Sequence, residues 1–392
     1  MFLEDSNSLI VNENSNTVKS ITFVHSGEDY FFRLQRLINK AQFEIHLQTY
    51  IFENDSTGSS IADCLKKAVK RNVKVYLLLD SYGSNSLPEK FVSNLLEHGI
   101  FFRFFSYNLF SLGRRLHHKV VVADGKIALI GGVNIANKYH GTKTERPWLD
   151  YAVQVEGKIA KPLQELCRNI YFKKKRQSRK LTMTAINLNS GTIVRILRND
   201  WLKRKNEISN AYLNRIGEAK REVIIVGCYF LPGKRIVNAL KKATQKGVKI
   251  KLILAGISDV QILRRATCYL YTSLLHCNIE LYEWNKSVLH GKAAIVDGEW
   301  STIGSFNIND LSSYGSIEMN VEIVSPEFST TVKFHLNKII DQCQKISIDT
   351  YEISHGSFAK MINWFYYYLI RYGLIMITYL PYKRLYRRYH AE

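Results

Sequence analysis

The sequence lacks any cysteine pattern that would hold a metal or a disulfide framework. Its six cysteines are scattered, without a Cys-x-x-Cys pair or a Cys/His cluster at zinc spacing. We therefore predict reduced thiols in a cytosolic protein, and a functional site that uses no metal. The N-terminal stretch MFLEDSNSLIVNENSN also lacks the basic and apolar regions of a secretory signal, which argues against export by the general pathway.

Acidic residues are scarce relative to basic ones. The chain has 34 Asp and Glu residues against 55 Lys and Arg residues, and its formal net charge is +21. The natural partners of such a chain are polyanions, of which nucleic acid and anionic lipid surfaces are the two obvious classes. Charge alone does not separate them. With 392 residues, 46% of them hydrophobic, the chain can form two ordinary domains or one large duplicated one.

An internal repeat favours the duplication. Residues 61–79 align without a gap with residues 236–254, at an offset of 175. In the first copy Ile61, Leu65 and Ala68 mark an amphipathic helix, and in both copies apolar β-branched runs precede and follow the helix. The order strand, helix, strand predicts an α/β fold in which a largely parallel sheet carries helices on its faces.

The repeat divides the chain into segments. We predict a first half over residues 21–172 and a second half over residues 191–350. The basic stretch within 173–190 is interpreted as a linker or surface loop, with a phosphate- or lipid-facing role as the alternative. Residues 1–20 form a polar extension, and residues 351–392 form a separate aromatic and basic tail.

A second repeated pattern, at an offset of 173, carries the chemistry. A histidine, a lysine, an aspartate and an asparagine recur with identical spacing in the two halves. A lone His-x-Lys would mean little, but two copies inside a duplication indicate an active site rather than a pair of structural histidines. The two sets are His117, Lys119, Asp124 and Asn134 in the first half, and His290, Lys292, Asp297 and Asn307 in the second.

The spacing has a structural meaning. His and Lys two residues apart on a strand point to the same face. In both copies the aspartate precedes a glycine between two apolar runs, which is a strong hairpin signal. From this pattern, a turn or salt-bridge role is favoured for Asp124 and Asp297 over direct chemistry.

The residue types suit a phosphate ester. A histidine can attack phosphorus or pass a proton, while lysine and asparagine stabilise charge on the non-bridging oxygens. Two sets facing each other supply one histidine as nucleophile, for which we favour His117, and the other, His290, as general acid and then base. Asp150 and Glu318 each open an apolar strand after the motif and could orient these rings, although an ordinary strand-end role is the alternative.

With its duplicated His-Lys-Asp motif, the sequence resembles the phospholipase D superfamily. The segments that carry a narrower resemblance, to short-form bacterial cardiolipin synthases, are Gln48–Phe52, Asp80–Ser84, Ile130–Asn134, Tyr229–Gly233 and Leu289–Lys292. The resemblance covers about residues 20 to 345 and implies two α-β-α halves about a pseudo-two-fold axis. It also implies catalytic roles for Asp124 and Asp297 beside the histidines and lysines. The implied reaction joins phosphatidylglycerol to a second phospholipid through a phosphatidyl-histidine intermediate, without a cofactor.

The tail bears on the choice of substrate. Residues 361–382 contain one charge, Arg371, and eight aromatic residues, and a basic cluster follows them. This composition is typical of a membrane interface. We favour an interfacial segment over a transmembrane span or a buried core helix, and hence a peripheral or re-entrant location on the cytoplasmic side of the cell membrane.

The tail also favours an anionic lipid surface over nucleic acid as the partner. A phosphodiesterase that hydrolyses phospholipid or nucleic acid is the alternative function, and a non-enzymatic membrane protein is the third.

Overall fold

The computed structural model describes residues 8–10, 18–105, 114–173, 186–187, 191–200, 205–309, 312, 315–354 and 356–389. The elements of the first half are β1 (Ser8–Ile10), β2 (Val18–His25), α1 (Glu28–Lys40), β3 (Glu44–Thr49), α2 (Ser56–Lys70), β4 (Lys74–Asp80), α3 (Glu89–Glu97), β5 (Phe101–Phe105), β6 (Arg115–Leu116), β7 (Lys119–Ala123), β8 (Ile127–Gly131), α4 (Asn137–His140), β9 (Tyr151–Gly157) and α5 (Ala160–Tyr171).

The second half repeats this order and extends it. Its elements are β10 (Ile186–Asn187), β11 (Ile193–Asp200), β12 (Lys205–Asn206), α6 (Glu207–Glu218), β13 (Glu222–Gly227), α7 (Lys234–Gln245), β14 (Lys249–Ala255), α8 (Gln261–Tyr269), α9 (Tyr271–Leu275), β15 (Ile279–Trp284), β16 (Lys292–Val296), β17 (Trp300–Gly304), β18 (Ser316–Val324), α11 (Pro326–Ile340), β19 (Gln344–Ile346), α12 (Ile348–Ser354) and α13 (Ser357–Tyr389). Most of the predicted basic linker, 174–185 and 188–190, lies outside the described residues, so the segment boundaries stay a prediction.

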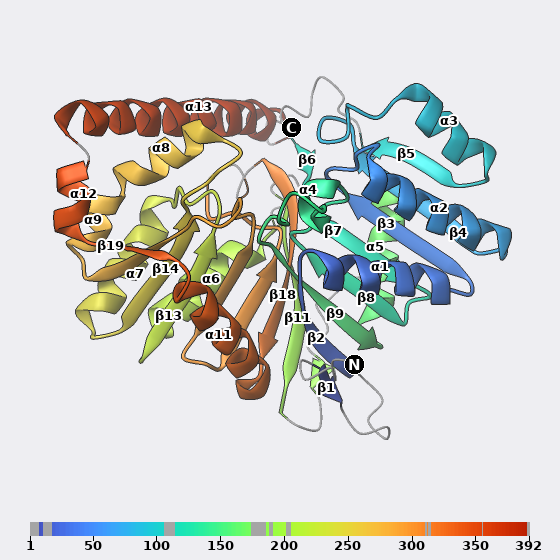
Figure 1. Cartoon of the computed structure of the whole chain (residues 1–392), viewed down its shortest axis with the longest axis horizontal. Helices are drawn as coiled ribbons and strands as arrows, with labels where there is room; N and C mark the ends of the chain where they lie inside the picture. Colours follow the sequence, from blue (N-terminus) through green and yellow to red (C-terminus); the bar gives the residue numbers. More distant parts are fainter. Residues whose placement is uncertain are drawn as a thin grey trace.

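Each half is built on one mixed sheet (Figure 1). The strand order is β1-β2-β9-β8-β7-β3-β4-β5 in the first half and β10-β11-β18-β17-β16-β13-β14-β15-β19 in the second. Among the described strands within each half, parallel pairing is confined to β3-β4-β5 and β13-β14-β15. The expectation of a largely parallel sheet is therefore wrong. The repeated motif forms hairpins, β7-β8 and β16-β17, and hairpins pair antiparallel.

The helix expected from the repeat is confirmed in both copies. α2 buries Ile61, Leu65 and Ala68 against the first sheet, and α7 buries Ile236 and Leu240 at the matched positions. In both halves these helices contribute to a hydrophobic cluster on the outer face of the sheet. Spacing of apolar residues by three and four positions thus determined which side of each helix is buried.

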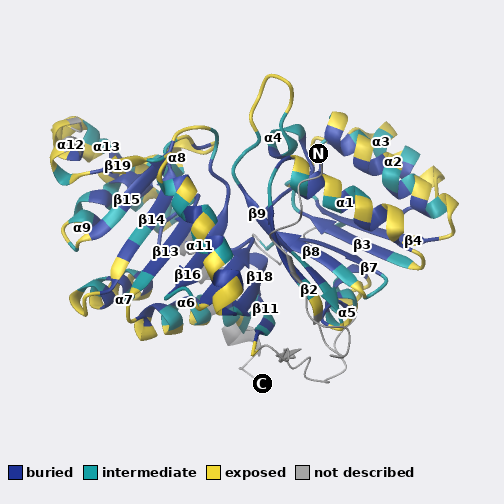
Figure 2. Ribbon diagram, turned by 60° about the horizontal axis from the view of Figure 1, so that its bottom comes forward, coloured by how far each residue is buried: buried dark blue, intermediate teal, exposed yellow. Residues whose placement is uncertain are grey.

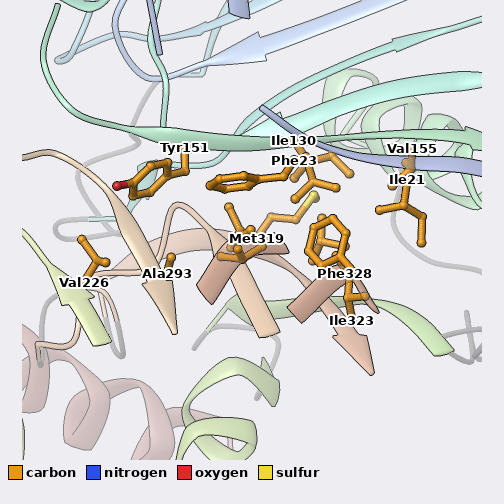
Figure 3. Packing of buried hydrophobic residues seen from close by; sticks show 14 of the residues in the cluster. Ile21, Phe23, Ile130, Tyr151, Val155, Val226, Ala293, Met319, Ile323 and Phe328 are labelled. Atoms are coloured by element: carbon orange, nitrogen blue, oxygen red, sulfur yellow. The ribbon is translucent and has the colours of Figure 1, made fainter. Parts of the chain in front are cut away.

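A third hydrophobic cluster joins the halves. The inner faces of the two sheets bury residues against one another, together with α5 and α11. Phe23 and Tyr151 enter this cluster from the first half, and Met319 and Phe328 enter it from the second (Figure 3). The strands of both sheets are mostly buried, whereas the helices expose their outer sides (Figure 2). The apolar contact holds the two halves in one orientation.

The halves also exchange backbone hydrogen bonds. β6, which comes from the first half, pairs in parallel with the start of β18, in a register that puts Leu116 opposite Ile317. The reciprocal contact is a parallel bridge between Leu149 and Leu289. The next residues along these segments are predicted site residues, His117 and Glu318 at the first contact and Asp150 and His290 at the second.

The tail forms the long helix α13, which packs against α8. The rings of Tyr269 and Tyr367 lie 4.5 Å apart between their centroids. No helix within the described part of the chain is long and apolar enough to cross a membrane. Six side chains on α13 are large, apolar or aromatic, and 50% to 70% exposed: Phe358, Met361, Trp364, Phe365, Leu369 and Tyr372.

Candidate active site

His117 belongs to the first half but is held by the second. Its backbone N–H donates to the carbonyl oxygen of Ile317 over 3.1 Å, which continues the pairing of β6 with β18. Its ring Nδ1 lies 3.0 Å from the carboxylate of Glu318. The hydroxyl of Ser305 donates to the same carboxylate over 2.5 Å. Because Nδ1–H donates to Glu318, the lone pair of His117 is on Nε2.

His290 is held in the reciprocal way by the first half. Its backbone N–H donates to the carbonyl oxygen of Leu149 over 2.8 Å, and its Nδ1 lies 2.5 Å from Oδ2 of Asp150. A Cβ atom at Gly132 would lie 2.3 Å from Asp150 Oδ1, so only glycine leaves room for this carboxylate. The structure thus brings each predicted carboxylate to the histidine of the other half.

The two lysines are buried beside the histidines, with 2% of Lys119 and 1% of Lys292 exposed. Lys119 Nζ donates to the carbonyl oxygen of His117 over 2.6 Å, and Lys292 donates to the carbonyl oxygen of His290. Burial, against the opposing effect of Glu318 and with a further contribution from the positive charge of Lys292, lowers the pKa of Lys119 to about 7. Because the charge of Lys292 acts on Lys119, an anion bound beside the two ammonium groups is favoured.

The histidines and carboxylates are also shifted by burial. Burial lowers the pKa of both His117 and His290, and the two lysines lower each pKa further. Burial raises the pKa of Asp150 to about 6, against the effect of Lys292. His117 is among the groups that lower the pKa of His290, so the two sets act on each other across the junction of the halves. They form one site.

The two asparagines lie in this site but are held differently. Asn134 accepts through Oδ1 from the backbone N–H of Ile51 over 3.0 Å, and its amide nitrogen donates to the Tyr139 hydroxyl over 2.8 Å. Asn307 accepts from the thiol of Cys228 over 2.9 Å. Burial raises the pKa of that thiol to about 11, so it stays protonated and a donor. In both asparagines a neighbouring donor fixes the carbonyl oxygen.

The two aspartates of the motif lie elsewhere. Asp124 accepts from the backbone N–H groups of residues 42–44 at 2.8 to 2.9 Å, and Asp297 does the same for residues 220–222. Both have positive φ, at 53° and 55°, in the hairpin turn. Each turn is a strand length, roughly 17 Å, from the lysine. The catalytic role carried over from the resemblance is therefore corrected: these carboxylates fix the start of β3 and β13, as the turn interpretation predicted.

Aromatic residues around His290 were not predicted as site residues. The rings of Tyr139, Trp148 and Tyr229 lie 5.2, 6.0 and 6.2 Å from its ring centroid. The Tyr139 hydroxyl is 3.5 Å from His290 Nε2. Tyr229 has a counterpart in Tyr50, whose ring lies 4.9 Å from that of His117, whereas Tyr139 and Trp148 lie outside the doubled motif. Proximity of Tyr139 to Asn134 in the sequence was the one available signal.

The arrangement offers two histidines, two ammonium groups and two amides around one point. No group of three or more His, Cys, Asp or Glu side chains within the described segments could hold a metal ion. The set can bind a phosphate group, supply a nitrogen nucleophile and move a proton.

Comparison with known proteins identifies the family. The family model described as cardiolipin synthase, phospholipase D-like domain, matches residues 34–167 and 212–340. Cardiolipin synthase B of Escherichia coli (strain K12) is 35% identical over 337 residues, which cover 83% of this chain and 82% of the relative. The chain belongs to the cardiolipin synthase family of the phospholipase D superfamily. The recognition made from the motifs is confirmed, and so is the interpretation as an enzyme of this superfamily.

The chain is also similar to a second cardiolipin synthase and, in its fold, to a solved structure. The minor cardiolipin synthase ClsB of Bacillus subtilis is 28% identical over 350 residues, with 84% of each chain covered. The crystal structure of phosphatidylserine synthase from Haemophilus influenzae has a TM-score of 0.72 and 14% sequence identity, and covers 95% of this chain and 98% of its own. At that identity the likeness concerns the fold alone, and it confirms two duplicated phospholipase D-like halves.

Proposed function

We propose that this member of the cardiolipin synthase family makes cardiolipin by transferring a phosphatidyl group from one phospholipid to phosphatidylglycerol through a phosphatidyl-histidine. The observation that carries the proposal is the reciprocal support of the two histidines, each by the carboxylate of the other half. A carboxylate on Nδ1 orients the ring and stabilises its protonated form. Two such histidines suit a reaction in two steps, because one can hold the phosphatidyl group while the other moves the proton.

In the first step His117 is the nucleophile. Its Nε2 attacks phosphorus, a P–N bond forms, the P–O bond to the donor's head-group alcohol breaks, and His290 gives that oxygen a proton. The assignment of roles rests on exposure and partners. The side chain of His117 is 14% exposed against 6% for His290. Among the described residues Nε2 of His117 has no partner, whereas Nε2 of His290 lies near the Tyr139 hydroxyl.

In the second step a hydroxyl of phosphatidylglycerol resolves the intermediate. His290 takes the hydroxyl proton, the oxygen attacks phosphorus, and the P–N bond to His117 breaks. Lys119, Lys292, Asn134 and Asn307 bind the non-bridging oxygens in both steps. Lys119 is suited to this role because the phosphodiester anion restores the charge that burial disfavours.

The substrates require access to a lipid surface. We propose that the exposed aromatic side chains of α13 lie in the interface of an anionic membrane on its cytoplasmic side. Near the N-terminus of α8, against which α13 packs, Ile257, Val260 and Ile262 add apolar area, being 37% to 48% exposed. Aromatic rings prefer the head-group region of a membrane, and the basic residues near the end of the sequence complement anionic head groups.

The test is product analysis on vesicles. Purified protein is incubated with phosphatidylglycerol vesicles, alone and with phosphatidylethanolamine, in excess chelator, and the lipids are separated. We expect cardiolipin in both cases, with glycerol released from phosphatidylglycerol alone. A His117→Ala preparation is the control for contaminating activity. Phosphatidic acid without cardiolipin means that water resolves the intermediate and the protein is a hydrolase. Cleavage of single-stranded DNA without any lipid product means a nuclease.

A further inference from the structure

A cavity of about 670 Å³ lies in the first half, away from the histidines. Its walls come from α1, the start of β2, the turn between β7 and β8, and the junction of β9 with α5. The turn is at the opposite end of the β7–β8 hairpin from Lys119, roughly 17 Å along the strand. The buried side chains of Thr22 and Leu37 belong to its lining.

The lining is strongly basic. Five lysines and two arginines contribute to it, against one carboxylate, Glu156, which accepts from the amide of Gln154 over 2.9 Å. Arg33 pairs with Asp29 over 2.7 Å. The other six basic side chains have no carboxylate partner in the described part of the chain: Lys19, Arg36, Lys40, Lys126, Lys158 and Lys161. Unpaired like charges around one cavity repel each other, so an anion bound there stabilises the fold.

The duplication supplies an internal control for this charge. Lys40 ends α1 and Glu218 ends α6, each two residues before the backbone N–H groups bound by the motif aspartate. Lys126 and Glu299 each stand two residues after that aspartate. The strand registers match Gln154 with Glu322. At all three positions the second half has glutamate where the first half has lysine or glutamine.

The glutamates of the second half are paired. Arg221 lies 3.0 Å from Glu299, and Arg195 lies 3.3 Å from Glu322. Arg215 lies 3.5 Å from Glu218. The positions that correspond to the cavity therefore carry ion pairs in the second half, whereas in the first half they leave an excess of positive charge. The fold does not require the positive cavity, which indicates a role in binding.

We propose that this cavity binds a soluble ligand that carries several phosphate groups. Lysine and arginine are the side chains that bind phosphate, and a volume of several hundred Å³ suits a small molecule rather than a polymer. The lining includes the end of β9, which lies at the lower right of Figure 1, whereas α13 lies along the upper left. If α13 lies on a membrane, the head groups of that membrane are too far away to enter the cavity. A ligand free in solution can enter it.

The experiment measures binding of inorganic tripolyphosphate to the full chain by titration calorimetry at constant ionic strength. The test variant replaces Lys126, Lys158 and Lys161, all exposed and lining the cavity, by glutamine. The matched control makes the same change at three exposed lysines of the second half, so both variants lose three charges: Lys234, Lys242 and Lys249. None of the six is placed in the active site.

We expect saturable binding to the wild type, a loss of affinity of about tenfold or more in the cavity variant, and less than about a twofold change in the control. Phosphatidyl transfer by both variants in detergent stays at the wild-type level, which shows that they fold. Equal losses in both variants, or no saturable binding to the wild type, overturn the proposal. If anionic vesicles, not tripolyphosphate, lose affinity for the cavity variant alone, the ligand is a lipid head group and the free-ligand source is wrong.

Discussion

His117 and His290 occupy matched positions in the two halves, but their surroundings differ. His290 is enclosed by the rings of Tyr139, Trp148 and Tyr229, whereas the ring contact of His117 is with Tyr50, at 4.9 Å. The scaffold, the carboxylate partner and the lysine are common to both. A duplicated site with identical core chemistry can therefore divide the labour, because the shell around each histidine evolves separately. Four experiments test this difference and the roles assigned to the two halves.

The largest effect is expected from the histidines themselves. His117→Ala and His290→Ala should each lower turnover by at least about 10³-fold, because each ring serves a step that the other does not. The double variant should be little worse than either single variant, since the two act as one unit. The measurement is cardiolipin formation in detergent. Near-normal activity in either single variant would show that the halves do not share a site.

Substitution of the two carboxylates tests whether each half orients the histidine of the other. Asp150→Asn and Glu318→Gln should each lower turnover of natural lipid by about 10²- to 10⁴-fold. A phosphodiester with a p-nitrophenolate leaving group needs no general acid, so Asp150→Asn, acting through His290, should retain a burst of p-nitrophenol. Glu318→Gln, acting through His117, should not. The reverse pattern would make His290 the nucleophile, and equal loss in both would contradict the division of roles.

The apolar surface is expected to have a smaller effect, on binding rather than chemistry. Replacing Trp364, Phe365 and Tyr372 by serine should weaken sedimentation with phosphatidylglycerol vesicles by at least about tenfold, because interfacial burial of the rings is lost. Activity in detergent should not change. The matched control replaces three apolar residues of similar exposure, 52% to 63%, on other helices: Phe32, Leu96 and Phe334. Equal weakening by the control, or aggregation of the α13 variant, would contradict an interfacial role.

The smallest expected effect is a change in pH dependence. Lys119 is charged below its pKa of about 7 in the free enzyme and neutral above it. As pH rises through 7, kcat/KM should fall by up to about tenfold per unit, because the neutral amine no longer stabilises the phosphate. Lys119→Arg should move this alkaline limb above pH 9, since arginine stays charged. Lys126→Arg, outside the site, is the control. If kcat/KM of Lys119→Arg fell at the same pH as that of the wild type, the fall would be due to a group other than Lys119.

The sequence predicted the site better than it predicted the sheets. Doubled spacing identified His117, Lys119 and their counterparts, because a strand with period two puts them on one face in any half-buried sheet. It did not predict that Asp150 would support His290. That contact depends on the register of one half against the other, which local patterns do not encode. Tyr139, Trp148 and the basic cavity were missed for a different reason, because these features occur in one half only and a repeat cannot reveal them.

The mixed sheet has a similar explanation. An apolar run predicts a strand but not whether that strand is parallel or antiparallel to its neighbours. The alternation of strand and helix around residues 61–79 predicts only the parallel strands, such as β3, β4 and β5. The Asp124–Gly125 turn indicates the antiparallel part, because a hairpin turn makes β7 and β8 antiparallel neighbours in the sheet.

The crossed contacts also set the time at which this protein becomes an enzyme. Glu318 follows His117 by 201 residues, and His290 follows Asp150 by 140. A ribosome must therefore reach β18 before His117 has its carboxylate, and it must pass residue 290 before Asp150 has its histidine, although the first half can bury its own core much earlier. The growing chain carries a folded but incompetent half-site. The site therefore has both of its histidine–carboxylate pairs only after the start of β18 has been made.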